Sequence, residues 1–407
     1  MYSIFIHVLR LLITLAVPFH TKAALFVSGR KHLLSRLNQA FAENNHPVIW
    51  VHAASLGEFE QARPILERIK SDLPRHKILL TFYSPSGYEV RKNYSGADYV
   101  FYLPWDYSSH MQRFVNITKP VLAIFIKYEF WKNAIGALHE KHIPVISVSS
   151  IFRSGQVYFQ WYGGSQRAIL SKISHFFVQN QISVELLKRI GIRDITHSGD
   201  TRFDRVQQLV RSPKSLPLVE KFKSDDKVFV IGSSWPEDMT VLSPFINDEK
   251  SLKFIIAPHE INATALKQVE TVIHRKLIRY SQIEQASDAE VLLIDNVGLL
   301  SQLYRFGEFA YVGGAFGKGL HNILEAAAYG IPVFFGNKKY QKFQEATDLI
   351  MRGGAFEVND FADLKEKYEN VTIPENFIRA CETNRMYVEE NTGATNKVME
   401  YINRTLG

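Results

Sequence analysis

From residue 47 onward, the chain alternates short apolar runs with segments in which apolar residues recur at helical spacing. The runs are rich in β-branched and aromatic residues and predict strands, whereas 59–70 and 131–142 predict helices. Continuous apolar strands between helices are typical of parallel sheets covered on both faces. The predicted strands are 47–52, 78–83, 99–103, 121–126, 145–148, 228–232, 253–257, 291–294, 309–312 and 332–335.

This alternation loosens at 209–222, where Pro213 and Pro217 stand among charged residues. A chain of 407 residues also exceeds the usual size of one domain. The pattern therefore predicts an α/β protein with two doubly wound domains. Their ligands are expected at the carboxyl ends of the strands, in a cleft between facing domains. The expected ranges are an amino-terminal helix over 1–30, a first domain over 31–208, and a second over 209–407 whose last helix can pack back on the first.

Residues 4–19 are mostly apolar, but the run is shorter than the about 20 residues that a membrane-spanning helix needs. On a helix, a narrow polar stripe forms from Ser3, His7, Arg10 and Thr14. This pattern favours a helix that lies in the membrane interface, or one inserted with its stripe against protein. The alternative is a buried helix of the first domain.

Charge is concentrated at the same end of the chain. Five of the seven net positive charges lie in residues 1–42, which contain no Asp or Glu. Anionic lipid head groups are expected to attract Lys22, Arg30, Lys31 and Arg36. The rest of the chain is nearly neutral, which argues against a nucleic-acid partner.

Composition narrows the class of protein further. A hydrophobic content of 46% excludes a disordered chain. The single cysteine, Cys381, excludes an intramolecular disulfide and a multi-cysteine metal cluster, and it fits a reducing compartment.

Three polar segments follow predicted strands of the first domain. Ser55 and Glu58 have the spacing of a capping box, but Glu58 at a strand end could instead act as a general base. The segment 84–87 contains Ser84 and Ser86, and it predicts either a turn or hydroxyl and N–H groups that face an anion. The segment 127–133 is either an ordinary strand-to-helix junction or part of a polar site.

The most distinctive segment is the glycine-rich stretch 313–325, which follows the predicted strand 309–312. Its four glycines permit positive φ and close backbone approach, and Lys318 together with the following helix start would attract an anion. The spacing fits neither a Walker loop nor a Rossmann fingerprint. The alternative is a loop that merely turns tightly. No D-x-D pair lies nearby, so no divalent metal is implied.

Taken together, the segments 52–58, 128–133, 199–204 and 313–332 resemble 3-deoxy-D-manno-octulosonic acid (Kdo) transferases, the lipid A glycosyltransferases of Gram-negative bacteria. The resemblance implies the GT-B fold, which has two Rossmann-like domains. It also implies an inverting transfer of Kdo from CMP-Kdo to the 6′-hydroxyl of a lipid A precursor, without a metal or other cofactor. The expected location is the cytoplasmic face of the inner membrane, against anionic lipids.

The resemblance also assigns residues. Glu58 matches the catalytic base, and Glu129 matches a second essential carboxylate. The nucleotide-binding candidates are Ser233, Ser234, His259, Gly313, Gly314, Lys318, His321, Asn322 and Glu325. The candidates for acceptor or sugar contacts are Ser55, Gly57, Ser84, Ser86 and Lys127.

Two positions depart from the family pattern. Lys132 stands where the family usually has proline, and His259 stands where it usually has arginine. A neutral imidazole is a weaker phosphate donor than a guanidinium group, so we expect a weaker phosphate contact at this position than in the family.

Two other functions remain possible on the sequence. One is a GT-B enzyme that uses a UDP-sugar, such as an epimerase of this fold, and binding of CMP rather than UDP would exclude it. The other is an inactive nucleotide-binding protein of the membrane surface, against which the presence of both Glu58 and Glu129 argues.

Overall fold

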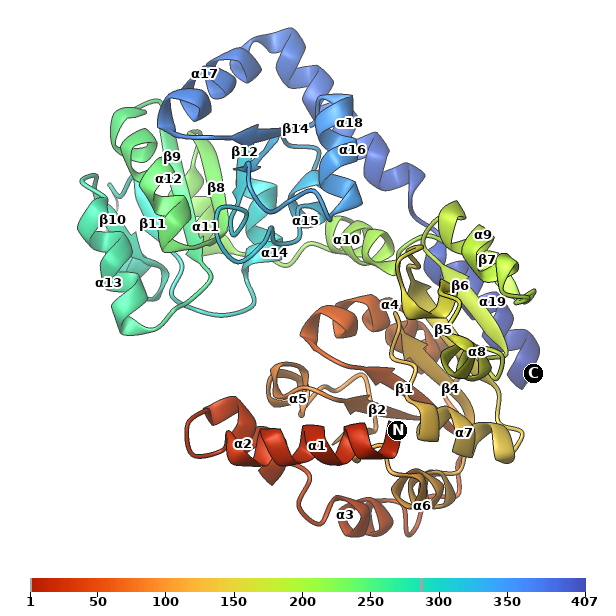
Figure 1. Ribbon diagram of the computed structural model, residues 1–407. Helices are drawn as coiled ribbons and strands as arrows, with labels where there is room; N and C mark the ends of the chain where they lie inside the picture. The colour runs from red at the N-terminus through yellow and green to blue at the C-terminus, as the bar shows by residue number, and fades with distance from the viewer. Residues whose placement is uncertain (1, 286–287) are drawn as a thin grey trace. The chain divides into compact units, whose positions relative to one another are not determined.

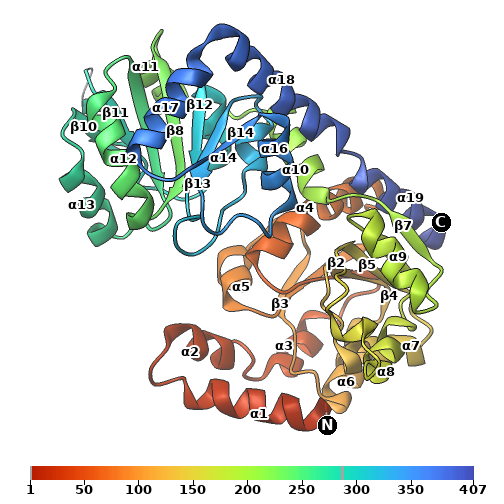
Figure 2. The same cartoon turned by 45° about the horizontal axis from the view of Figure 1, so that its top comes forward.

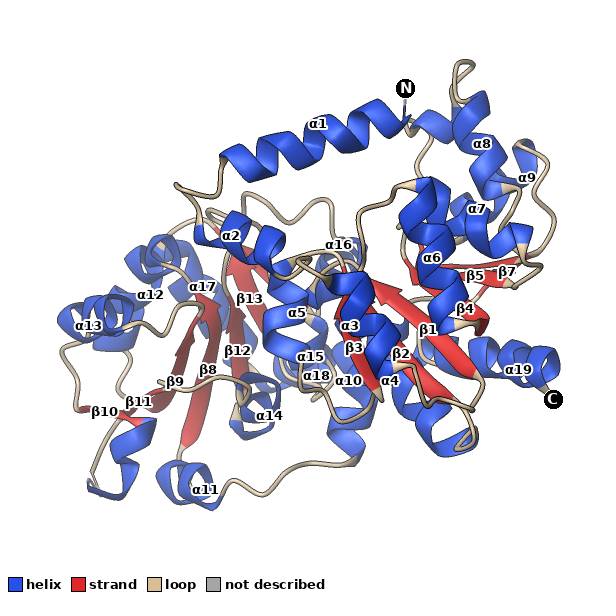
Figure 3. Cartoon of the chain, turned by 90° about the horizontal axis from the view of Figure 1, so that it is seen from below, coloured by secondary structure: helices blue, strands red, loops and turns tan. Residues whose placement is uncertain are grey.

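The protein consists of two α/β units in a computed structural model that describes residues 2–285 and 288–407. The first unit combines Met1–Arg205 with Thr392–Gly407, and the second is Val206–Asn391. Residues 1, 286 and 287 fall within the expected ranges 1–30 and 209–407 but lie outside the described residues. In each unit, helices cover a central set of strands (Figures 1 and 3).

Seven parallel strands form the sheet of the first unit: β1 (Val48–Ala53), β2 (Lys77–Phe82), β3 (Tyr99–Tyr102), β4 (Pro120–Ile126), β5 (Val145–Ser150), β6 (His175–Val178) and β7 (Ile195–His197). Their order is β3-β2-β1-β4-β5-β6-β7. The chain therefore runs outward from β1 to one edge, returns beside β1 as β4, and runs outward to the other edge.

The helices of this unit connect the strands or precede them. They are α1 (Tyr2–Leu15), α2 (Thr21–Ser28), α3 (Leu33–Ala40), α4 (Leu56–Asp72), α5 (Pro85–Arg91), α6 (Ser108–Thr118), α7 (Lys132–Glu140), α8 (Gly164–Leu170), α9 (Gln181–Arg189) and α19 (Ala394–Leu406), with a 3-10 turn at Val157–Phe159. The boundary between the units falls within α10 (Thr201–Arg211).

The second unit repeats this plan with the strands β8 (Lys227–Ser234), β9 (Leu252–Pro258), β10 (Leu277–Arg279), β11 (Val291–Leu293), β12 (Phe309–Val312), β13 (Val333–Gly336) and β14 (Ala355–Val358). All are parallel, in the order β10-β11-β9-β8-β12-β13-β14. Figure 2 shows β10 and β11 toward one edge of this sheet and β8 and β12 nearer its centre.

The helices of the second unit are α11 (Pro217–Lys223), α12 (Pro236–Asp248), α13 (Ala263–Val272), α14 (Leu300–Leu303), α15 (Leu324–Ala327), α16 (Gln344–Arg352), α17 (Phe361–Thr372) and α18 (Pro374–Glu390). Two 3-10 segments, Tyr280–Gln285 and Tyr304–Phe306, complete it.

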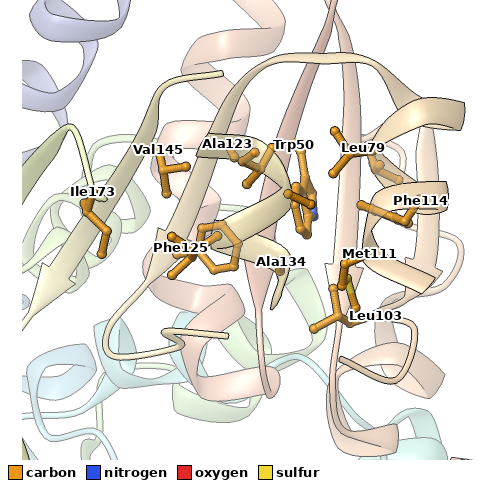
Figure 4. Packing of buried hydrophobic residues seen from close by; sticks show 14 of the residues in the cluster. Trp50, Leu79, Leu103, Met111, Phe114, Ala123, Phe125, Ala134, Val145 and Ile173 are labelled. Carbon is orange, nitrogen blue, oxygen red and sulfur yellow. The ribbon is translucent and has the colours of Figure 1, made fainter. Parts of the chain in front are cut away.

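Burial on both faces explains why the strands read as unbroken apolar runs. On one face of the first sheet, Trp50 packs edge-on against Phe114 of α6 and Phe125 of β4, with ring centroids 4.8 and 5.1 Å apart (Figure 4). On the other face, side chains of β1, β2 and β4 pack against α4 and α19. Full burial of one such side chain contributes roughly 1.5–3 kcal/mol to stability.

Strand order also fixes where a site can form. The direction in which successive strands are added to the sheet reverses between β1 and β4 in the first unit, and between β8 and β12 in the second. These points are called the reversals below. Loops that follow two such strands diverge to opposite sides of the sheet and leave a crevice at its carboxyl edge. The candidate residues Ser55, Gly57 and Glu58, the segment 127–133, Ser233 and Ser234, and the segment 313–325 directly follow these four strands or end them.

The amino-terminal segment forms two helices rather than the single helix expected over 1–30. The first ends at Leu15, a turn covers residues 16–19, and α2 begins at Thr21 (Figure 1). Pro18 lies in this turn, where its missing N–H and its ring are incompatible with a continuing helix. Among the described residues, no helix is both long and apolar enough to cross a bilayer.

One side of α1 packs on the first unit, and the opposite side is exposed. Ile6 is buried against Phe26 and Trp105, whereas the exposed apolar residues of this segment are Ile4, Phe5, Val8, Leu11, Leu12, Leu15 and Phe19. At about 100° per residue, the polar stripe lies between the packed side and the exposed apolar side, since Arg10 is next to Ile6 and His7 is next to Leu11 on the helix surface. The stripe is exposed as well, so α1 is not the wholly buried core helix of the alternative reading.

Arg30 does not belong to the exposed basic residues with which it was grouped. Its guanidinium is buried and donates hydrogen bonds to the carbonyls of Leu103, Phe26 and Tyr83 at 2.9, 3.0 and 2.7 Å. It also lies 3.8 Å from the ring centroid of Phe26. Burial lowers the pKa of Arg30 to about 10. Arg30 therefore attaches α2 to the sheet, while Lys22, Lys31 and Arg36 are exposed.

The last helix belongs to the first unit, so the expected second domain ends before residue 407. The side chains Val398, Met399 and Ile402 of α19 are buried in the same cluster as Phe59 of α4. Asp204, in the segment 199–204 noted above, accepts hydrogen bonds from the backbone N–H of Gly393 and Thr395 at 2.5 and 2.6 Å. Asp204 thus caps α19 from another part of the chain.

We expect Asp204→Ala to lower the free energy of unfolding by about 1–2 kcal/mol, because the first turn of α19 loses its acceptor. Urea unfolding and amide hydrogen exchange measure the effect, and exchange should accelerate specifically in α19. The control is Asp225→Ala, at an exposed aspartate between α11 and β8. Unchanged exchange rates in α19 would contradict this cap.

Candidate functional site

Glu58 lies in the first turn of α4, directly after β1. The capping box predicted as an alternative is absent, because the Ser55 side chain makes no bond to the helix backbone. Instead, its hydroxyl donates to Oε2 of Glu58. Both side chains are partly exposed. A carboxylate at a helix start, held by a hydroxyl and open to solvent, is able to accept a proton from a bound hydroxyl group.

Gly57 lies beside this pair, and a Cβ added there would meet only Ser55 Oγ, at 3.8 Å. Ser84 and Ser86 lie after β2, where Ser84 Oγ accepts a 3.3 Å hydrogen bond from the Ser86 N–H. Ser84 is the N-cap of α5. The segment is therefore the start of a helix rather than a turn between elements, and its use by an anion stays a prediction.

Glu129 lies across the reversal, after β4, in a loop that two serines hold. Lys127 adopts the left-handed conformation at φ 59°, which is uncommon for a residue with a side chain. Its carbonyl accepts hydrogen bonds from Ser147 Oγ and Ser150 Oγ of β5, at 3.0 and 2.6 Å. These bonds fix the direction in which the chain leaves β4 and therefore the position of Glu129.

Side chains from the same loop and from β1 surround the Glu129 carboxylate. The indole N–H of Trp131 donates to Oε2 at 3.0 Å, and His52 Nε2 of β1 lies 3.8 Å from the same oxygen. The Glu129 side chain is 19% exposed, whereas His52 is fully buried. Glu58 and Glu129 thus follow adjacent strands β1 and β4, on either side of the reversal.

In the second unit, a buried carboxylate joins the two loops at the reversal. Asp238 Oδ2 accepts the N–H of Trp235, after β8, at 2.8 Å and the N–H of Gly314, after β12, at 2.9 Å. Its Oδ1 accepts the hydroxyl of Tyr311 at 2.9 Å. Burial raises the pKa of Asp238 despite these bonds. Asp238 thus fixes the spacing between the two loops.

The glycine-rich loop folds back on itself before a short helix. The carbonyl of Gly314 accepts the N–H groups of Gly317 and Gly319 at 3.1 and 2.8 Å, and both Gly314 and Gly319 have positive φ. The helix expected after the loop is a single turn, α15, which begins at Leu324. A helix of one turn has few aligned peptide groups and therefore only a weak dipole. We conclude that this helix attracts an anion less strongly than the sequence predicted.

Three aromatic rings stack beside this loop. Trp235 stacks on His259 with centroids 4.3 Å apart, and His259 lies 4.6 Å from His321. Lys318 Nζ is 5.8 Å from the Trp235 ring centroid. Three of the predicted nucleotide-binding side chains therefore gather around one tryptophan.

The hydrogen bond between Trp235 and His321 defines the tautomer of the histidine. The indole N–H donates to His321 Nε2 at 3.1 Å, so the ring hydrogen of neutral His321 lies on Nδ1. Burial, and then the charge of His259, lower the pKa of His321 to about 4. Burial also lowers the pKa of His259. Both rings are therefore neutral near pH 7 and act through N–H groups rather than through charge.

Ser233 and Ser234 end β8 at this point, and Ser233 has φ 53°. The Ser234 hydroxyl is buried and has no hydrogen-bond partner among the described residues. It lines a cavity of about 370 Å³ between α12 and α13, together with Trp235 and Met239.

Asn322 and Glu325 lie at the end of the glycine-rich loop, where Asn322 Nδ2 donates to Glu325 Oε1 at 3.2 Å. Their predicted contact with a ribose stays a prediction.

Within residues 2–285 and 288–407, no group of three His, Cys, Asp or Glu side chains could hold a metal ion.

Sequence reasoning missed three residues that shape these loops: Trp235, Asp238 and Asp106. The carboxylate of Asp106 accepts the N–H groups of Asn133 and Ala134 at 3.0 and 2.9 Å and so caps α7, the helix after Glu129. Trp235 directly follows the predicted Ser233 and Ser234, and Asp238 lies in the first turn of the next helix, so the sequence held a signal for both. Asp106 stands after β3, at a distance in sequence from the segment that it caps.

Sequence comparison places the first unit among known proteins. Residues 31–205 match the family described as 3-deoxy-D-manno-octulosonic-acid transferase (kdotransferase). A transferase of that name from Aquifex aeolicus is 28% identical, over 84% of this chain and 91% of the relative. Another from Haemophilus influenzae is 27% identical, over 87% and 86%. The matched residues include both Glu58 and Glu129.

Comparison with solved structures shows the fold. The UDP-GlcNAc 2-epimerase of Neisseria meningitidis has a TM-score of 0.60 and 15% identity, covering 88% of this chain and 100% of its own. The MurG protein of Acinetobacter baumannii has a TM-score of 0.56 and 10% identity, covering 88% and 99%. The expected GT-B class, with two parallel-sheet units, is confirmed.

We expect Gly313→Ala to destabilise the second unit by about 1–3 kcal/mol, the usual effect of overpacking. The new methyl group would lie 2.3 Å from the Ser233 carbonyl oxygen and 2.7 Å from Asp238 Oδ2, so the two loops must separate. Thermal unfolding measures the effect.

The matched control is Gly136→Ala in α7, where an added Cβ meets nothing within 4 Å. This change should stabilise the protein by about 0.5–1 kcal/mol, because alanine favours a helix interior. Equal melting temperatures for Gly313→Ala and the wild type would contradict the close contact between the loops.

Proposed function

We propose that this chain is a Kdo transferase, which transfers Kdo from CMP-Kdo to the 6′-hydroxyl of a lipid A precursor in lipopolysaccharide synthesis. Residues 31–205 match that family, and relatives of that name are 28% and 27% identical. The observation that carries the proposal is the position of Glu58 and Glu129. Both carboxylates lie in the matched segment and follow the two strands at which the first sheet reverses.

In the proposed reaction, the acceptor binds at the first unit and its hydroxyl attacks the anomeric carbon of Kdo. Glu58 takes the hydroxyl proton, the new C–O bond forms, and the bond to the CMP phosphate breaks. Glu129 and Lys127 contact the sugar or the acceptor, together with Ser55, Gly57, Ser84 and Ser86. The unobstructed space at Gly57 supports this role, because nothing in the described fold requires glycine there.

We propose the second unit as the binding site for the donor. The N–H groups of the glycine-rich loop, Lys318 and the ring N–H of His321 would stabilise the departing CMP phosphate without a metal. Ser233, Ser234, His259, Asn322 and Glu325 would complete the nucleotide contacts. The neutral state of His259 supports the expectation that its phosphate contact is weaker than that of an arginine.

The function is tested with purified protein, CMP-Kdo and a lipid A precursor, with product identified by mass. We expect Glu58→Gln to lower kcat by about 100-fold or more while the melting temperature stays near that of the wild type. The control is Glu60→Gln on the same helix, which should retain activity. Product formation by Glu58→Gln at the wild-type rate would exclude Glu58 as the base.

Nucleotide specificity separates this function from that of a UDP-sugar enzyme. CMP should raise the melting temperature of the wild type, and UDP should not. Stabilisation by UDP alone would overturn the choice of donor. Addition of EDTA should leave the rate unchanged, and a rate that depends on Mg²⁺ would exclude the metal-free reaction.

We also propose that α1 and α2 hold the enzyme on the cytoplasmic face of the inner membrane. The exposed apolar side of α1 supports this, as do the exposed cations Lys22, Lys31 and Arg36. A groove of about 730 Å³ between the two helices is lined by Leu12, Ile13, Ala16, His20, Thr21, Lys22, Ala23, Phe26, Ser84 and Pro85. Its apolar floor and its position at Ser84 suit an acyl chain of the lipid acceptor.

We expect the double variant Leu12→Ser, Leu15→Ser to lose most binding to vesicles that contain phosphatidylglycerol, because each change removes roughly 1.5–3 kcal/mol of apolar burial. Cosedimentation measures the binding. The control is Ile182→Ser on α9, because Ile182 is 63% exposed and resembles Leu12 and Leu15 at 58% and 62%. Equal loss of binding in the control would contradict a specific role for α1.

A further inference from the structure

His52 is a polar side chain within the apolar interior of the first unit. It lies on β1 in register with Thr81 of β2 and Phe125 of β4, and its exposed fraction is 0%. Its ring centroid is 5.6 Å from that of Phe125. A buried imidazole lowers stability unless its two nitrogens find partners.

The partner of Nδ1 determines the tautomer of this ring. Thr81 Oγ1 accepts the indole N–H of Trp50 at 2.7 Å and lies 2.9 Å from His52 Nδ1. An indole nitrogen only donates, so Thr81 Oγ1 accepts from Trp50, and its single hydrogen has no acceptor other than Nδ1 among the described residues. Donation of this hydrogen to Nδ1 satisfies the threonine and places the hydrogen of the neutral imidazole on Nε2.

That Nε2 is directed toward the candidate site. It has no hydrogen-bond partner among the described residues, and it lies 3.8 Å from Glu129 Oε2. The distance is longer than a hydrogen bond, but contacts of this kind commonly shorten when substrate binds. Asp106 is a further carboxylate whose charge interacts with His52.

We propose that His52 is the positioning residue of Glu129: its Nε2–H donates to Oε2 in the substrate complex and leaves Oε1 for the substrate. The inference rests on the proposed function and deepens it. The indole N–H of Trp131, two residues further along the loop, donates to the same oxygen, so the two donors together restrict the orientation of the carboxylate. Hydrogen bonds from Trp50 to Thr81 and between Thr81 and His52 hold the imidazole in one orientation on the sheet. A fixed imidazole in turn restricts the position of Glu129, which lies in a loop.

Two substitutions of similar size separate this role from a packing role. The amide of His52→Gln reaches the position of Nε2 and can donate to Glu129, whereas the amide of His52→Asn reaches only that of Nδ1. We expect His52→Asn to lower kcat by about 10- to 100-fold, the effect of losing one hydrogen bond to a charged group, with little change in KM for CMP-Kdo. We expect His52→Gln to retain activity within about fivefold, a smaller loss than that of one such hydrogen bond.

The matched control is His175→Asn. His175 also lies on a strand of this sheet, β6, and its Nε2 is 2.8 Å from the Thr196 hydroxyl. It should retain wild-type activity. If His52→Asn is folded and as active as the wild type, or if Gln and Asn lose activity equally, His52 does not position Glu129. Absence of product from the wild type would instead overturn the proposed function.

A second readout does not depend on activity. In protein with ¹⁵N-labelled histidine, the two ring nitrogens of His52 distinguish the tautomers by NMR, and His52→Gln assigns the signal. We expect the hydrogen on Nε2, with a shift of that resonance in Glu129→Gln. A hydrogen on Nδ1, or no response to Glu129→Gln, would overturn the proposal.

Discussion

The candidate site depends on one constraint, the reversal of strand order within each parallel sheet. Crossovers between parallel strands have a fixed hand, so a chain that fills one half of a sheet and then the other must leave two adjacent strands toward opposite faces. The pairs β1/β4 and β8/β12 are these strands. Glu58 and Glu129 follow adjacent strands for this reason, although 70 residues of chain separate them in sequence.

Strand order brings the loops together, but side chains from neighbouring strands and helices give them their shape. Two serine hydroxyls of β5 hold the carbonyl of Lys127 in a left-handed turn, and Asp238 of α12 holds the N–H of Gly314. In both cases a side chain supplies the hydrogen bond that the backbone group would have made with a neighbouring strand, had its own strand continued. The loops are thereby held in place before any substrate arrives, which reduces the entropy lost on binding.

The sequence predicted the central strands of both sheets because their burial on both faces produces unbroken apolar runs. It missed β6, β7, β10 and β14, three of which are edge strands. These short strands contain polar residues, His175, Thr196, Arg279 and Glu357, that interrupt the apolar runs. The loops were predicted from polar residues at strand ends. The hydrogen-bonded groups around the loops were not predicted. Asp106 and His52 contact residues that are distant in sequence, whereas motif spacing indicates only contacts between residues close in sequence. The capping-box alternative for Ser55 failed for a related reason, because its hydroxyl bonds a side chain rather than the backbone.

Asp106 links the amino-terminal helices to the loop that carries Glu129. Its carboxylate caps α7, and it also accepts the hydroxyl of Tyr2, the first described residue of α1. Burial raises the pKa of Asp106, so its charge depends on these donors for stabilisation. Displacement of Tyr2 would leave the carboxylate with fewer donors and weaken the cap that ends the Glu129 loop. The surface that faces the proposed membrane and the proposed site of transfer therefore share one buried group, and the packing of α1 and the position of Glu129 are not independent.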